Sequence, residues 1–308
     1  TFNNNGVGGI VSTYSLVYTV GNAYEGGVLS PNGEIYFVPD SATRGQKINI
    51  LTGVVSTYSL IYTGAGAAYF GGVLAANGDI HFIPCNANRG QKINSSGIVS
   101  TYSLAYTSTS AYTGGVLAPN GDIHFVPNTA GRGQKISAAG VVSTYSLVYT
   151  ADPYIGGVLA SNGDIHFIGS KIGQKISAAG VVSTYSLVYT VADGYWGGVL
   201  APNGDIHFVP RSAARGQKIS AAGVVSTYSL VYTGGGSYQG GVLAPNGDIH
   251  FVPNLANRGQ KINTLTGIVS TYSLVYTASE ASTGGILAPD GSIYFIPRGG
   301  VVGQKIST

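Results

Sequence analysis

Alternating aspartate and histidine residues are the side chains of this 308-residue chain best suited to acid–base or metal chemistry. An Asp-Ile-His triplet occurs five times, at Asp79 and His81, Asp122 and His124, Asp164 and His166, Asp205 and His207, and Asp248 and His250. Alternate residues of a β-strand share a face, so each pair could hold a metal ion or share a proton. Two equivalent segments carry Glu34 with Tyr36 and Ser292 with Tyr294 instead. Because the pair can be lost, we expect a structural hydrogen-bonding role for it.

Tyrosine and arginine recur at two positions that could bind a sugar or a protein surface. The tyrosines stand two residues before a Gly-Gly pair, at Tyr24, Tyr69, Tyr112, Tyr154, Tyr195 and Tyr238. The arginines stand directly before a Gly-Gln pair, at Arg44, Arg89, Arg132, Arg215 and Arg258. Both side chains stack and donate hydrogen bonds, which makes them candidates for ligand binding. Alternatively, the tyrosines pack inside the protein and the arginines cap loop carbonyl groups.

The position after each tyrosine varies most among the copies. It is occupied by Glu25, Phe70, Thr113, Ile155, Trp196, Gln239 and Thr283. Packing explains such variety less readily than binding does. We expect Trp196, the single tryptophan, to be a binding hot spot if its ring is exposed.

Signatures of enzymes are absent from the sequence. It has no GxSxG, P-loop, CxxC or HExxH motif, and Cys85 has no Cys or His at ligand-like spacing. Unique charged residues are expected to be solvated loop residues, namely Asp40, Asp152, Asp193, Glu280, Lys171 and Arg211. We therefore predict no catalytic activity, no cofactor and no metal. A hydrolase or lactonase would need a metal near the centre of the fold.

These residues belong to a segment that returns seven times and reads GGVLAPNGDIHFVP in its commonest form. The copies follow one another at about 41 to 45 residues and begin at Gly26, Gly71, Gly114, Gly156, Gly197, Gly240 and Gly284. A period of this length that contains short β-like runs indicates a closed propeller or a solenoid. Since no linker interrupts the repeats, we predict a single domain over residues 1–308.

Each repeat divides into four predicted strands, as residues 181–220 illustrate. The strands are expected at Val181–Thr190, Gly197–Ala201, Ile206–Val209 and Gly216–Ser220. A Pro-Asn-Gly-Asp hairpin over residues 202–205 joins the second of these to the third, because Asn-Gly accepts positive φ angles. The four strands predict one antiparallel blade of a propeller.

The segments GGVLAPNGDIHFVP, RGQKIS and VVSTYSLVYT resemble the blade of NHL-type propellers, in which an inner strand ends in a Pro-x-Gly hairpin. The resemblance spans all seven copies, more than many NHL-type wheels contain. It implies that GGVLA is innermost and VVSTYSLVYT outermost. The chain would then begin with an outer strand, Ile10–Thr19, and end with a third strand, Gly303–Thr308. We predict an all-β, seven-bladed propeller closed by pairing of these two strands.

The connections between strands emerge on two opposite faces of such a wheel. The loop rim carries the outer-to-inner and second-to-third loops, residues 191–196 and 210–215 in the example. The hairpin rim carries the hairpins and the Ser-Ala-Ala-Gly turns, residues 202–205 and 220–223. The copies are nearly uniform on the hairpin rim and differ on the loop rim. Because binding residues usually sit on loops of a rigid scaffold, we expect the loop rim to bind the ligand.

Composition narrows the range of partners. The 15 basic and 12 acidic residues give a net charge of +3 and are spread along the chain, so nucleic acid is not expected to bind. No run approaches the roughly 20 apolar residues of a spanning helix, and we expect no membrane insertion. One cysteine allows no internal disulfide, and the chain opens on Thr1 without Met or a signal peptide, as in a processed or trimmed product.

The sequence thus predicts a multivalent binding module, with a glycan or cell-surface glycoconjugate as the favoured partner and an extracellular or particle-surface setting. Near-identical sites on one rim would add weak contacts through effective concentration. The alternative is a protein-interaction or structural scaffold domain of a larger surface fibre or assembly. A lectin-like module should use equivalent pockets in several blades, whereas a scaffold should use one patch that crosses unlike blades.

Overall fold

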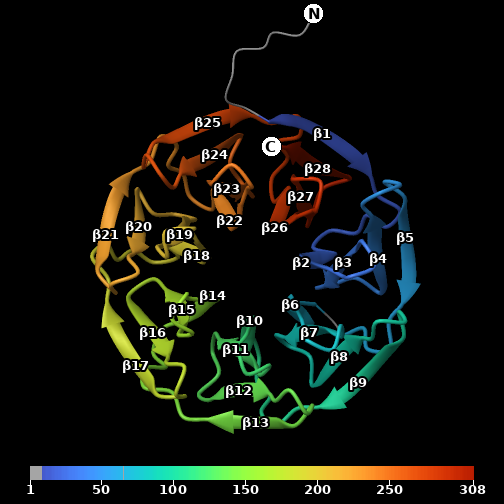
Figure 1. Cartoon of the computed structure of the whole chain (residues 1–308). Coiled ribbons are helices and arrows are strands. Elements are labelled where there is room, and N and C mark those ends of the chain that lie inside the picture. Colours follow the sequence, from blue (N-terminus) through green and yellow to red (C-terminus); the bar gives the residue numbers. More distant parts are fainter. Residues whose placement is uncertain (1–8, 65) are drawn as a thin grey trace, which may run out of the picture.

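The computed structural model describes residues 9–64 and 66–308, which form 28 strands and no helix. The strands build seven four-stranded sheets arranged as blades around a central axis (Figure 1). This confirms the predicted all-β propeller. The predicted domain, residues 1–308, also includes residues 1–8, which lie outside the described part. No helix able to span a membrane is found among the described residues.

The first four blades are given with the innermost strand first. Blade 1 contains β2 (Tyr24–Leu29), β3 (Glu34–Pro39), β4 (Arg44–Asn49) and β5 (Val55–Ser59). Blade 2 contains β6 (Tyr69–Leu74), β7 (Ile80–Pro84), β8 (Arg89–Ile93) and β9 (Val99–Ser103). Blade 3 contains β10 (Tyr112–Leu117), β11 (Ile123–Pro127), β12 (Gly133–Ile136) and β13 (Val142–Tyr145). Blade 4 contains β14 (Tyr154–Leu159), β15 (Ile165–Gly169), β16 (Ile172–Ile176) and β17 (Val182–Ser186).

The last three blades complete the ring. Blade 5 contains β18 (Tyr195–Leu200), β19 (Ile206–Pro210), β20 (Arg215–Ile219) and β21 (Val225–Ser229). Blade 6 contains β22 (Tyr238–Leu243), β23 (Asp248–Pro253), β24 (Arg258–Asn263) and β25 (Val269–Ser273). Blade 7 contains β26 (Ser282–Leu287), β27 (Ser292–Pro297), β28 (Val302–Ser307) and, outermost, β1 (Ile10–Ser15).

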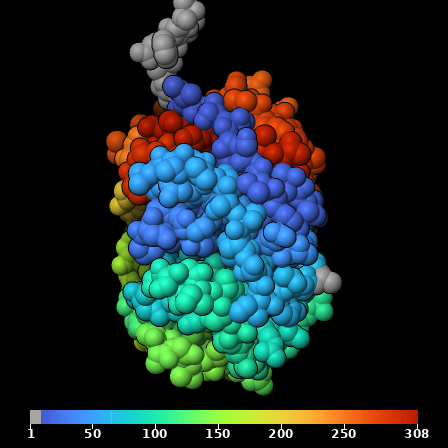
Figure 2. Space-filling model, turned by 90° about the vertical axis from the view of Figure 1, so that its right-hand side faces the viewer, coloured from blue at the N-terminus to red at the C-terminus, as the bar shows by residue number. Residues whose placement is uncertain are grey.

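The two ends of the chain close the ring as predicted. Strand β1 pairs antiparallel with β28, in a register that runs from Ile10 opposite Ser307 to Ser15 opposite Val302. Figure 2 shows the blue N-terminal residues lying against the red C-terminal blade. The closing strand ends at Ser15 and not at Thr19. Closure gives the third strand of blade 7 the outer partner that its own repeat lacks.

Two strand boundaries in the example repeat differ from the prediction by two residues or more. The outer strand β17 ends at Ser186 and not at Thr190, because the N–H groups of Val188 and Tyr189 donate to Gln217 Oε1 of the next blade at 3.0 and 2.9 Å. The inner strand β18 begins at Tyr195, ahead of the glycine pair, with a bulge between Tyr195 and Gly198. The alternation of residue types along the chain predicts neither the contact with Gln217 nor the bulge.

The hydrophobic core lies between neighbouring blades. Val158 and Ile168 of blade 4, for example, pack with Tyr195, Ile206 and Phe208 of blade 5. The rings of Tyr195 and Phe208 meet edge to face, with 5.4 Å between their centroids. Equivalent clusters lie at the other blade interfaces, so each blade is stabilised by burial against its neighbours.

Backbones approach most closely at the axis. Gly156 of blade 4 has a φ of +82°, and a Cβ added to it would lie 2.7 Å from the Cα of Gly197 in blade 5. A side chain there would meet the neighbouring backbone directly. The glycines of the inner strands therefore allow the blades to converge.

We predict that Gly156→Ala destabilises the protein far more than Gly180→Ala. Gly180 has nearly the same φ, +83°, but nothing lies within 4 Å of its added Cβ. Both changes place a side chain in the left-handed region, at a cost of about 1–2 kcal/mol. Gly156→Ala should cost about 1–3 kcal/mol more for overpacking against Gly197. Urea denaturation of the two variants measures the difference, and equal losses of unfolding free energy would refute the axial-contact explanation.

Candidate functional site

The six repeated tyrosines are buried in the blades. Each is at most 1% exposed, and the set comprises Tyr24, Tyr69, Tyr112, Tyr154, Tyr195 and Tyr238. Their hydroxyl groups point outward along the blade; that of Tyr195 donates to the carbonyl of Arg215 at 3.1 Å. The expectation that these rings contact a ligand is thus corrected, because core packing already covers their surfaces. The packing alternative describes the tyrosines.

The five repeated arginines are exposed on the loop rim. They are Arg44, Arg89, Arg132, Arg215 and Arg258, each at or beside the start of a third strand. The carbonyl group of each accepts the hydrogen bond of a buried tyrosine. Within the described part of the chain, none of the five guanidinium groups forms an ion pair. The backbone of this position is structural, while its side chain faces solvent.

The varied position brings seven residues of six kinds together around the axis. Glu25, Phe70, Thr113, Ile155, Trp196, Gln239 and Thr283 line a hollow of about 160 Å³ together with the inner glycines. Phe70 of blade 2 and Trp196 of blade 5 meet there, with 5.9 Å between ring centroids. The Arg211 guanidinium lies 4.2 Å from the centre of the Trp196 ring. Trp196 is only partly buried, so some of its surface remains open to a ligand.

A second varied position reaches this hollow through Arg211, which lies over Trp196, and Arg298, which lies beside Glu25, and it was not recognised as a set from the sequence. It follows the second strand of each blade and is occupied by Asp40, Cys85, Asn128, Ser170, Arg211, Asn254 and Arg298. The signal that could have identified it is the same as for the first position: unlike residues at one place in an otherwise uniform repeat. The two positions make the centre of the loop rim asymmetric.

Glu25 is a buried acid at this centre. Its side chain is 3% exposed, and Oε2 lies 3.3 Å from Arg298 Nε. Burial raises the pKa of Glu25 to about 8, and the nearby Arg298 charge only partly opposes this. Asp40, expected to be a solvated loop residue, is also buried, and burial raises its pKa to about 6. Both carboxyl groups therefore release their protons less readily than exposed ones do.

A different kind of pocket repeats on the hairpin rim, between neighbouring blades. Four such pockets lie between blades 1 and 2, 2 and 3, 3 and 4, and 4 and 5, with volumes of about 300, 220, 330 and 410 Å³. The last three share one plan: an Asp, a His and a Lys come from one blade, and a Ser-Ala-Ala-Gly turn comes from the next. Sequence reasoning placed the candidate site on the opposite rim and missed these pockets.

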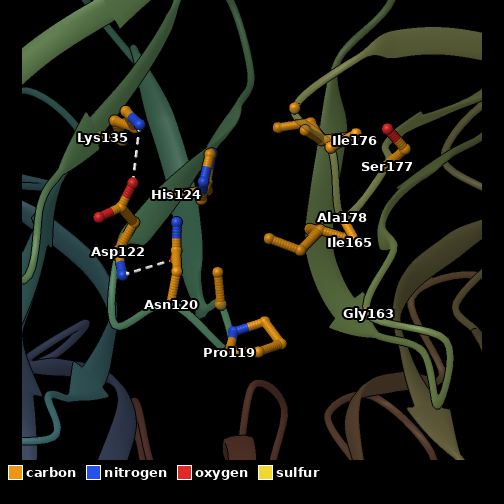
Figure 3. A pocket seen from close by; sticks show the side chains of 13 residues that line it. Pro119, Asn120, Asp122, His124, Lys135, Gly163, Ile165, Ile176, Ser177 and Ala178 are labelled. Atoms are coloured by element: carbon orange, nitrogen blue, oxygen red, sulfur yellow. Dashed lines mark hydrogen bonds and ion pairs between the residues drawn. The ribbon is translucent and has the colours of Figure 1, made fainter.

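One wall of each of these three pockets is a fixed polar array, shown for blade 3 in Figure 3. Lys135 Nζ donates to Asp122 Oδ2 at 2.7 Å, and the N–H of Asp122 donates to Asn120 Oδ1 at 3.0 Å. Burial disfavours the Asp122 carboxylate, but the hydrogen bond and charge of Lys135 more than compensate and hold its pKa below the usual value. The opposite wall presents Ile165 and Ile176 of blade 4.

The histidine of the array is neutral. His124 is buried beside Tyr145, with 5.5 Å between ring centroids. Burial and the Lys135 charge lower the pKa of His124 to about 4. The Asp122 carboxylate accepts a hydrogen bond from Lys135 and not from this histidine, so the aspartate of the Asp-Ile-His pair has the structural hydrogen-bonding role expected for it. No cluster of three or more His, Cys, Asp or Glu side chains that could hold a metal occurs among residues 9–64 and 66–308.

Comparison with known proteins finds likeness in the fold. The chain matches no protein-family model. It also matches no curated protein sequence.

Three solved structures illustrate the fold-level likeness. A streptogramin B lyase has a TM-score of 0.84 at 21% identity, with 97% of each chain covered. A catalytically inactive virginiamycin B lyase from Staphylococcus aureus, solved with quinupristin, has a TM-score of 0.83 at 21% identity and covers 97% of this chain and 99% of its own. The WD40 propeller domain of Doa1 reaches 0.71 at 12% identity, covering 97% and 98%. At such identities the likeness establishes the propeller fold alone.

The buried histidines predict acid sensitivity. Burial lowers the pKa of His81, His124, His166, His207 and His250 from 6.5 to about 4. Between these values the unfolded chain binds protons that the folded chain does not, so stability falls as pH decreases from 6.5 to 4. Replacing all five by Tyr, the residue at this position in blades 1 and 7, should reduce the loss of unfolding free energy between pH 7 and pH 4.5.

Urea denaturation at the two pH values tests this prediction. Glu25 and Asp40 have raised pKa values and act in the opposite direction, but they are the same in both proteins and cancel in the comparison. An equal pH-dependent loss in parent and variant would contradict the assigned role of the histidines.

Proposed function

We propose that this propeller is a multivalent, lectin-like binding module whose repeated sites are the inter-blade pockets of the hairpin rim. The observation that carries the proposal is the recurrence of one pocket plan at three successive blade interfaces. A lectin-like module needs equivalent sites, and equivalent sites need equivalent residues. The uniform rim meets that need, whereas the loop rim, where we first expected the ligand, does not.

The two walls of the pocket suit a small carbohydrate. Asn120, Asp122 and Lys135 offer amide, carboxylate and ammonium groups to hydroxyl groups of a ligand, and their mutual hydrogen bonds hold them in place. Ile165 and Pro119 offer an apolar surface for the C–H face of a sugar ring. The larger pockets, at about 330 and 410 Å³, fall at the lower end of the range of about 300–1,000 Å³ for small-ligand sites.

Binding without catalysis is part of this proposal. With a pKa of about 4, His124 is a poor proton donor or acceptor near neutral pH, and Asp122 is held by Lys135. Several weak sites on one rim would raise avidity by a factor of about 10²–10⁴ on a surface that displays many copies of the sugar. A cell or particle surface is the setting in which such a module would gain most.

Blocking the pockets should abolish glycan binding. We predict that the triple variant Ala139→Tyr, Ala179→Tyr, Ala222→Tyr, which fills three pockets from exposed turn positions, reduces the signal on a glycan array at least about tenfold through lost avidity. The control variant Ala192→Tyr, Ala214→Tyr adds tyrosines at exposed positions of the loop rim and should bind as the parent does. Failure of the parent to bind any glycan, or undiminished binding by the blocked variant, would overturn the proposal.

A further inference from the structure

The net charge of the chain lies entirely on the loop rim. Eight of the 15 basic residues and five of the 12 acidic residues belong to loop-rim segments, which leaves seven of each for the hairpin half of the blades. The loop-rim half therefore carries a net charge of +3, and the hairpin half carries a net charge of 0.

The excess charge is carried by side chains that are free to bind. Arg44, Arg89, Arg132, Arg215 and Arg258 are exposed and form no ion pair within the described residues. The lysines of the hairpin half differ, since those of blades 1 to 6 are bonded to a carboxylate at 2.6–2.7 Å. An arc of unpaired cations on one face complements an acidic partner.

The centre of the same face has the composition of a binding hot spot. Tryptophan and arginine dominate such spots, and here Arg211 is stacked on Trp196, which contacts Phe70. The hollow beside them is mainly apolar and also contains one buried acceptor without a hydrogen-bond partner, Gln239 Oε1. An apolar side chain with a nearby backbone N–H group would fill the hollow and satisfy this acceptor.

The residue pattern favours a partner without rotational symmetry. The seven residues of the first varied position are of six kinds and those of the second are of five kinds, although the rest of the repeat is nearly uniform. A polymer of identical sugar units presents the same groups to each blade and would gain nothing from this variety. A polypeptide, whose side chains differ from residue to residue, can match it.

From these observations we infer that the loop rim docks an acidic segment of another protein. Its carboxylate groups lie on the exposed arginines, and one of its apolar side chains enters the axial hollow against Trp196 and Phe70. This interaction is independent of the carbohydrate sites on the hairpin rim. The protein would thus join a glycan-bearing surface on one face to a protein partner on the other.

Fluorescence offers a direct test, because Trp196 is the only tryptophan of the chain and lines the hollow. The probe is a fluorescein-labelled peptide of alternating Asp and Glu with one central Leu. The control peptides replace the acids by Gln or the Leu by Ser. We expect the acidic Leu peptide to bind at least about tenfold more tightly than either control, more weakly as salt is raised, and with a change in Trp196 emission.

Variants of the full chain test whether the peptide binds to the positive charge of the exposed arginines. Replacing the five exposed arginines by Gln should weaken peptide binding at least about tenfold, whereas replacing them by Lys, which keeps the charge, should preserve most of it. The variant with blocked hairpin-rim pockets should bind the peptide normally, so that this inference and the proposed carbohydrate function can fail separately. If the blocked variant also lost peptide binding, this result would contradict the claim that the two faces bind independently.

Two other results would overturn the inference. The first is equal binding of the acidic and Gln peptides. The second is a sulfated polysaccharide, heparin, that binds more tightly than the acidic Leu peptide, loses affinity in the arginine-to-Gln variant and leaves Trp196 emission unchanged. That outcome would assign the arginines to an anionic glycan.

Discussion

A buried glutamine side chain ties every blade to the chain that leaves the preceding blade. Gln217 Oε1 accepts from the N–H groups of Val188 and Tyr189, and an equivalent pair of hydrogen bonds is made by each of the seven glutamines. These N–H groups have just left the outer strand and would otherwise lack partners inside the protein. The link made by Gln46 joins Val17 and Tyr18, which follow the closing strand, so the same interaction continues across the seam.

The residue after each glutamine uses the opposite face of the same strand. Alternation along the strand turns Gln134 toward blade 2 and Lys135 toward the pocket shared with blade 4. Lys135 then fixes Asp122, and the hairpin residue Asn120 is fixed by Asp122 in turn. The short Gly-Gln-Lys segment thus both spaces the blades and orders the polar wall of the pocket. The order of this wall and the link between blades thus depend on adjacent residues.

The predictable part of the structure is the part that the repeat encodes locally. Asn-Gly hairpins, alternating strands and the missing outer strand of the last copy were enough for the blades and the closure. The early end of β17 at Ser186, the burial of Tyr195 and the meeting of Phe70 with Trp196 depend on other blades. Such contacts arise only when the ring is closed, and no local pattern contains them.

The uniform and the varied positions of the repeat differ in the residues that surround them. Hairpin and strand positions contact two neighbouring blades in the same way in each copy, so a change in one copy must fit the same surroundings as all others. Residues at the axis meet the residues of the other blades across a small hollow, as Glu25 does beside Thr283 and Arg298. Their surroundings are unique, and unlike side chains there disturb no repeated contact. A wheel of near-identical blades can therefore combine several equal sites on one face with one unequal site on the other, because the strands between them keep the two sets of contacts apart.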